Sequence, residues 1–165
     1  MISKKDIIYL TLLLLAAIPQ AADGQNRVVV SKSNFRMVVV TPAGDTLLSC
    51  PVGIGANAGQ KQKVGDCRTP EGTFTIASIE DASLWTHDFH DGQGQRQGAY
   101  GKWFIRLKVK GFRGIGIHGT CFPESVGKRG SEGCIRMLGD DLERLVTLVH
   151  PGDKVVVLPD VSTLP

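Results

Sequence analysis

Short runs of β-branched and apolar residues, separated by turn-forming residues, recur through most of this chain. Such runs, bounded by Gly, Pro, Asn or Asp, are typical of strands joined by hairpins. We expect strands at residues 27–30, 35–41, 46–52, 73–77, 102–109, 115–118 and 154–158. No internal repeat or low-complexity segment interrupts the pattern.

One segment near the C-terminus has a helical pattern instead. Asp140 and Asp141 suit an N-terminal cap and the positive end of a helix dipole, and Pro151-Gly152 would end the helix. Its apolar face consists of Leu138, Leu142, Leu145, Val146 and Val149. The sequence therefore predicts a mainly β domain with one packed α-helix near the C-terminus.

Residues 1–24 are typical of a secretory signal peptide. Lys4 and Lys5 precede a largely apolar run at 7–18, and small residues follow it. The run is too short for a comfortable membrane span, so we expect no stable span after cleavage, with an uncleaved anchor as the alternative. We expect residues 25–160 to form one domain and residues 161–165 to form a tail. The exported protein would then be located in the periplasm or cell envelope.

The formal net charge of +3 is mildly basic and far from a nucleic-acid-binding signature. Export would place the four cysteines in an oxidising compartment, where two disulfides are possible. Cys50 lies in an apolar run and is expected in the core. Cys67 and Cys121 lie in loops and are the candidate disulfide pair, and a disulfide is also the structural alternative for Cys134.

Two long loops need an interpretation. Residues 53–65 are glycine-rich but lack the Gly-Lys-Ser/Thr ending of a phosphate-binding loop, so we expect a simple connection. Residues 81–99 are polar and carry aromatic side chains, as functional flaps do. His87 and His90 there have no matching ligand pair elsewhere at zinc spacing, so no metal ion is expected.

His118 and Cys134 are the residues most suggestive of chemistry. A thiol attacks a carbonyl group only as the thiolate, and an imidazole can take its proton. Residues 115–117 would deliver His118 to the end of a strand, where a glycine-containing loop follows. The alternative is that each residue is structural.

The surrounding residues resemble the L,D-transpeptidase catalytic domain family. The resemblance rests on His118-Gly119-Thr120, on Ser131-Glu132-Gly133-Cys134-Ile135-Arg136-Met137, and on Asp141 and Leu145 in the following helix. The turn Thr69-Pro70-Glu71-Gly72 and the segment Ala99-Tyr100-Gly101 also fit. The resemblance implies a β-sandwich or barrel-like catalytic domain with one packed α-helix, spanning the whole region after the leader.

The resemblance also implies roles for individual residues. Cys134 would be the nucleophile, His118 its base and later acid, and the Gly119 carbonyl would orient the imidazole. The N–H groups of Gly133 and Cys134 would form the oxyanion hole.

Three further residues are implied around this centre. Arg136 would bind a substrate carboxylate, or else form a structural salt bridge. Tyr100 would place its hydroxyl near the reacting carbonyl or pack as a strand-end aromatic, and Ser131 would contribute to substrate binding or cap or brace the loop. Glu132 departs from the family pattern, in which many members carry histidine, and a carboxylate there would oppose thiolate formation unless it points to solvent.

The activity implied by the family is acyl transfer in peptidoglycan. Its members cleave a tetrapeptide stem before the terminal D-alanine through a cysteine thioester and pass the acyl group to an amine, forming a 3-3 crosslink; they also react with carbapenem-type inhibitors. Water as the acceptor would make an L,D-carboxypeptidase. The rival from another class is a non-catalytic envelope-binding module with disulfide-bonded cysteines.

Overall fold

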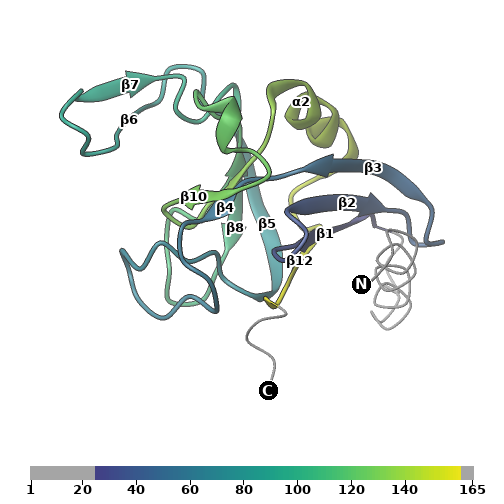
Figure 1. Ribbon diagram of the computed structural model, residues 1–165. Coiled ribbons are helices and arrows are strands. Elements are labelled where there is room, and N and C mark those ends of the chain that lie inside the picture. The colour runs from purple at the N-terminus through teal and green to yellow at the C-terminus, as the bar shows by residue number, and fades with distance from the viewer. Residues whose placement is uncertain (1–24, 161–165) are drawn as a thin grey trace, which may run out of the picture.

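The computed structural model describes residues 25–160, so the expected signal peptide at 1–24 and the tail at 161–165 lie outside the described residues. Eight strands form one curled sheet (Figure 1). They are β1 (Arg27–Ser31), β2 (Arg36–Val40), β3 (Thr46–Pro51), β5 (Gly72–Asp81), β8 (Trp103–Lys108), β9 (Gly116–His118), β11 (Ile135–Arg136) and β12 (Lys154–Leu158). Their order is β11-β9-β8-β5-β12-β1-β2-β3. The predicted mainly β fold is confirmed.

Two small sheets accompany the large one. The strand β4 (Ile54–Gly55) pairs with β10 (Arg129–Ser131), and β6 (Thr86–Asp88) pairs with β7 (Gln95–Gln97). A short 3-10 helix spans Pro123–Ser125, and α2 spans Gly139–Leu148. The segment 81–99, expected to be a flap, thus contains the β6–β7 hairpin, which projects from the body of the domain (Figure 1).

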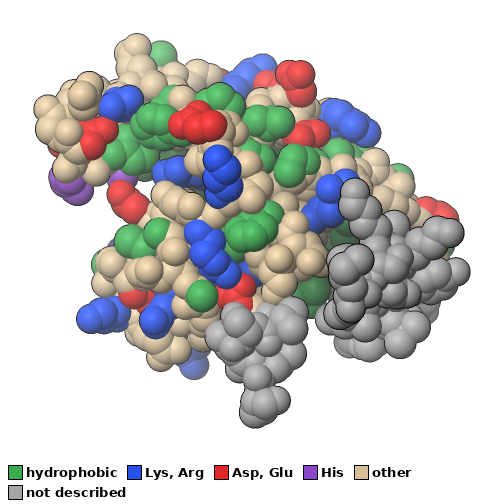
Figure 2. Space-filling view, in the orientation of Figure 1, with side chains coloured by type: hydrophobic (Ala, Val, Ile, Leu, Met, Phe, Trp, Pro, Cys, Tyr) green, Lys and Arg blue, Asp and Glu red, His purple; other side chains and the backbone are tan. Residues whose placement is uncertain are grey.

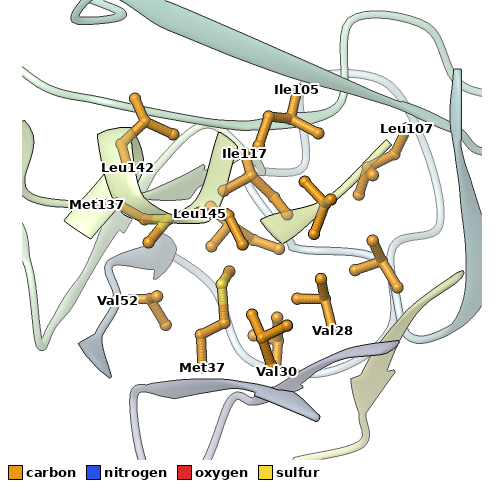
Figure 3. Packing of buried hydrophobic residues seen from close by; sticks show 14 of the residues in the cluster. Val28, Val30, Met37, Val52, Ile105, Leu107, Ile117, Met137, Leu142 and Leu145 are labelled. Carbon is orange, nitrogen blue, oxygen red and sulfur yellow. The ribbon is translucent and has the colours of Figure 1, made fainter. Parts of the chain in front are cut away.

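The core forms where the alternating apolar positions of the strands meet α2 (Figure 3). Met37 and Val39 on β2 face Cys50 and Leu48 on β3, and all four are buried. From the helix, Leu142 and Leu145 are at most 1% exposed. Burying one such leucine is worth about 2–3 kcal/mol, so α2 is held mainly by its apolar face.

The start of α2 differs from the sequence prediction. Leu138 is the N-cap residue, has an extended backbone and makes no side-chain cap, so Asp140 and Asp141 lie in the first turn instead. Their charges still face the positive end of the helix dipole. Leu138 is 37% exposed and does not belong to the buried face, because the helix has not yet begun there.

Lys32 joins the loop after β4 to the end of β12. Its side chain is fully buried, and its Nζ lies 2.6 Å from Glu71 Oε1 and 3.1 Å from Asp160 Oδ2. The same ammonium donates to the carbonyl oxygens of Gly59 at 2.8 Å and Thr69 at 3.2 Å. A buried charge needs such partners, and this one ties the loop to the sheet.

All four cysteines lie in the described region, and all have free thiols. The candidate disulfide between Cys67 and Cys121 is not formed. Cys50 is buried as expected, and this burial raises the pKa of its thiol to about 12. No helix within residues 25–160 is long and apolar enough to cross a membrane.

Candidate active site

The parallel pairing of β9 and β11 brings the two candidate catalytic residues together. Ile135 pairs with Ile117, and Arg136 pairs with His118. Side chains of paired residues share a face, and the two isoleucines are buried in the core. His118 and Arg136 therefore face the opposite side, and Cys134, one residue before β11, falls on their side.

His118 is held in one orientation by its surroundings. Its Nδ1 donates to the Gly119 carbonyl at 2.5 Å, which leaves Nε2 as the proton acceptor. The Phe104 ring stacks on the imidazole with centroids 5.4 Å apart, and the Tyr100 ring meets it edge-on at 5.0 Å. Burial lowers the pKa of His118 to about 4, so the imidazole is neutral near pH 7 and ready to accept a proton.

The Cys134 thiol donates to the Gly114 carbonyl at 3.2 Å rather than to His118. Burial raises the pKa of the thiol to about 11, although the Gly116 amide and Arg136 act in the opposite direction. Glu132 raises it further, as its charge predicts. The free site therefore holds a neutral thiol and a neutral imidazole, and the thiol must turn toward His118 before proton transfer. Catalytic hydrogen bonds often form only when substrate is present.

The loop before Cys134 is braced by Ser131. The Ser131 hydroxyl donates to the Cys134 carbonyl at 2.6 Å and accepts from the Gly133 N–H at 3.1 Å. Gly133 has φ +132°, and a Cβ there would lie 2.9 Å from the Arg68 carbonyl oxygen, so only glycine fits.

This brace changes the expected oxyanion hole. The Gly133 N–H, implied as one of its two donors, is already bonded to Ser131. Within residues 25–160 the Cys134 N–H makes no hydrogen bond and stays available.

Arg136 lies beside these groups with its guanidinium unpaired. The residue is 8% exposed, and its Cζ lies 5.7 Å from the centre of the Phe89 ring. No carboxylate within residues 25–160 forms an ion pair with it, so the structural salt bridge considered as the alternative is not formed.

These side chains line a pocket of about 460 Å³ between the β6–β7 hairpin and the loops at 61–67 and 112–115. Figure 2 shows the corresponding hollow beneath the projecting hairpin, with histidine side chains on its underside. Arg113 and Arg136 contribute positive charge, whereas the charge of Lys61 is balanced by Asp66 and Glu132 is the one carboxylate on the described wall. Such a pocket favours an anionic ligand.

Sequence reasoning missed two contributors to this pocket. Lys61, in the loop read as a simple connection, is buried with its Nζ 2.8 Å from Asp66 Oδ1. His87, on the hairpin, lies with Nε2 3.1 Å from Glu132 Oε1 and Nδ1 3.1 Å from the Tyr100 hydroxyl. No sequence signal links His87 to Glu132, because 45 positions separate them.

Histidine and acidic residues of the hairpin do not assemble into a metal site. Within residues 25–160 no group of three or more His, Cys, Asp or Glu side chains is placed to hold a metal ion.

Comparison with known proteins is consistent with this geometry. The family model of the L,D-transpeptidase catalytic domain matches residues 25–157. The chain is 29% identical over 163 residues to the Escherichia coli K12 protein named "Probable L,D-transpeptidase YcfS", covering 90% of this chain and 48% of that protein. It spans about half the length of the curated relatives it matches.

Solved structures share the fold. An L,D-transpeptidase from Mycobacterium smegmatis aligns with a TM-score of 0.61 at 21% identity, covering 81% of this chain and 58% of that one. L,D-transpeptidase 3 from Mycobacterium tuberculosis, solved with a faropenem-derived adduct, aligns with a TM-score of 0.61 at 20% identity, covering 81% and 60%.

Proposed function

We propose that this chain, which belongs to the L,D-transpeptidase catalytic domain family, is a cysteine acyltransferase that acts on peptidoglycan stem peptides. The observation that carries the proposal is the shared face of β9 and β11, from which His118, Cys134 and Arg136 line one pocket. A nucleophile, a base and an unpaired guanidinium are the groups that acyl transfer from an anionic peptide needs.

The first half-reaction forms a thioester. A stem-peptide carboxylate pairs with Arg136, and the thiol turns from Gly114 to give its proton to His118 Nε2. The sulfur attacks the carbonyl of the third stem residue, and the Cys134 N–H donates to the resulting oxyanion. His118 then gives its proton to the departing amine of the terminal D-alanine.

The second half-reaction releases the acyl group. An amine of a neighbouring stem attacks the thioester and gives a proton to His118, and the sulfur leaves and recovers that proton. The product is a 3-3 crosslink. Neither half-reaction requires a metal ion or an organic cofactor.

The location and the inhibitors follow from the same proposal. Residues 1–24 have the pattern of a signal peptide, which supports export to the cell envelope where stem peptides are found. One structural neighbour was solved with imipenem and another with a faropenem-derived adduct. Acylation of Cys134 by a carbapenem is therefore part of the proposal.

The test is to incubate the purified protein with tetrapeptide muropeptides and follow the products by mass. Crosslinked dimers support transpeptidation, whereas tripeptide without dimers would identify an L,D-carboxypeptidase. Cys134→Ala should abolish both products. The matched control is Cys121→Ala, because Cys121 is also a free thiol but does not line the pocket. Full activity of Cys134→Ala would contradict the mechanism.

A further inference from the structure

Three side chains beside the reacting pair form a hydrogen-bonded chain that the proposed mechanism does not use. His87 on β6 lies 3.1 Å from the Glu132 carboxylate through Nε2 and 3.1 Å from the Tyr100 hydroxyl through Nδ1. The three residues come from the hairpin, the loop before β11 and the segment before β8. The hairpin is thereby joined to both walls of the pocket.

The chemistry of the three groups determines where the protons lie. An ionised carboxylate only accepts hydrogen bonds, so His87 Nε2 carries a hydrogen and donates it to Glu132. In the neutral imidazole Nδ1 is then an acceptor, and the Tyr100 hydroxyl must donate to it. In the imidazolium Nδ1 also carries a hydrogen and donates to the Tyr100 oxygen, which frees the hydroxyl hydrogen for another acceptor.

The freed hydrogen would be useful in this site. The Gly133 N–H is occupied by Ser131, so the Cys134 N–H has no second backbone partner in the oxyanion hole. The Tyr100 ring lies 5.0 Å from the His118 ring and lines the same pocket as Cys134. Burial, followed by the charge at Cys134, raises the pKa of Tyr100, so the hydroxyl keeps its proton and can donate it.

We propose that His87 is a positioning residue that decides whether the Tyr100 hydroxyl donates to the oxyanion. Neutral His87 holds the hydroxyl hydrogen on Nδ1, and protonated His87 releases it toward the substrate carbonyl. This inference rests on the proposed function, because it assigns a second oxyanion donor to the same acyl transfer. It makes that donor depend on pH, since histidine changes its charge near neutral pH.

Among the described residues, titratable or charged groups face His87 from the loop before β11, the segment before β8, and the strands β9 and β7. They are Glu132 at 3.1 Å, Tyr100 at 3.1 Å, His118 through its charge, and Arg96 as the cross-strand partner on β7. His118 titrates outside the range of interest, because its pKa is lowered to about 4 by burial. The remaining groups are present in the parent and in the His87 variants alike, so a change in pH dependence between them reports on His87.

The experiment measures single-turnover acylation of Cys134 by a carbapenem between about pH 5 and pH 8, where histidine changes its charge. The quantity compared is the ratio of the rate of the parent protein to that of Tyr100→Phe. This ratio cancels the ionisation of the thiol, which both proteins share, and isolates the contribution of the hydroxyl. It should be on the order of a hundredfold at the acidic end, the effect of one oxyanion donor, and fall toward unity at the basic end.

Substitution of His87 should remove this pH dependence. In the His87→Ala background the hydroxyl has no imidazole to hold it, so the same ratio should be high and flat. In the His87→Gln background the amide can bond both neighbours but cannot change charge, so the ratio should be flat as well. The matched control is His90→Gln on the same hairpin, whose side chain is 86% exposed and which should keep the slope of the parent.

The outcomes separate this inference from the proposed function. A parent protein that is not acylated at Cys134 would refute the proposed nucleophile. Acylation with a ratio that keeps its slope in both His87 variants would refute the role of His87. A purely structural contact of the hairpin would lower the rates by one factor at every pH and leave the slope unchanged, which would also overturn the inference.

Discussion

Gly116→Ala tests whether the position of the His118 imidazole depends on the packing behind it. Gly116 pairs with Arg106 on β8, two positions along the strands from the pair formed by Phe104 and His118. A Cβ at position 116 would lie 2.5 Å from Phe104 Cζ and 2.7 Å from the Ile105 carbonyl oxygen. The Phe104 ring would have to move by roughly 1 Å to reach van der Waals distance from the new Cβ. The Ile105 carbonyl oxygen cannot move in this way, because it belongs to the backbone of a packed strand.

The size of the effect follows from this displacement. Overpacking of this kind costs about 1–3 kcal/mol, which a domain of ordinary stability, about 5–15 kcal/mol, survives. The Phe104 ring is stacked on the imidazole at 5.4 Å with a tilt of 10°, so its movement displaces His118. A shift of about 1 Å in a catalytic group can lower the rate on the order of a hundredfold.

Two measurements check this prediction. Urea unfolding gives the stability, and single-turnover acylation of Cys134 by a carbapenem gives the rate. The matched control is Gly130→Ala, since a Cβ at Gly130 meets nothing within 4 Å. Adding Phe104→Leu to Gly116→Ala should relieve the clash with the ring but not the clash with the Ile105 carbonyl oxygen. It should therefore recover part of the stability and none of the rate, because the stacked ring is then missing. A Gly116→Ala protein as stable and as active as Gly130→Ala would refute the reasoning.

Three further predictions concern stability and substrate binding. Lys32→Met should destabilise the domain by about 3–5 kcal/mol in urea unfolding, because two carboxylates lose their buried cation; a change below about 1 kcal/mol, the level of a surface ion pair, would contradict this. Burial lowers the pKa of His118 to about 4 in the folded protein, from an ordinary value of 6.5. Between these two pH values the unfolded chain binds a proton on His118 and the folded protein does not, which favours unfolding. Stability should therefore fall by up to roughly 3 kcal/mol between about pH 6.5 and pH 4, and His118→Asn should lose that part of the slope. Arg136→Ala should raise KM for a stem peptide by roughly ten- to a hundredfold, as loss of a charged hydrogen bond does, and by more than Ser131→Ala; equal effects would argue against a carboxylate clamp.

Most of the fold was predictable because its longer strands have alternating apolar residues, a pattern that is visible over a few neighbouring positions of the sequence. The runs of alternating apolar residues at 35–41 and 46–52 became β2 and β3, with Met37 and Cys50 paired in the core. Short strands such as β4 and β11 escaped prediction, since two residues carry no periodicity and become strands only through their partners. The cap of α2 was misplaced for a similar reason, because helix boundaries depend on backbone geometry more than on residue type.

The sequence by itself determined the β-rich domain, its packed helix and the two residues, His118 and Cys134, whose chemistry pointed to acyl transfer. These depend on residue type and local spacing, which are read directly from the chain. Only the tertiary structure decided that the Cys134 thiol donates to the Gly114 carbonyl and that the Gly133 N–H donates to the Ser131 hydroxyl. The tertiary structure also placed His87 next to Glu132, 45 positions away in the sequence. Such a contact depends on the strand register and on where the β6–β7 hairpin folds against the sheet, and neither can be read from local sequence.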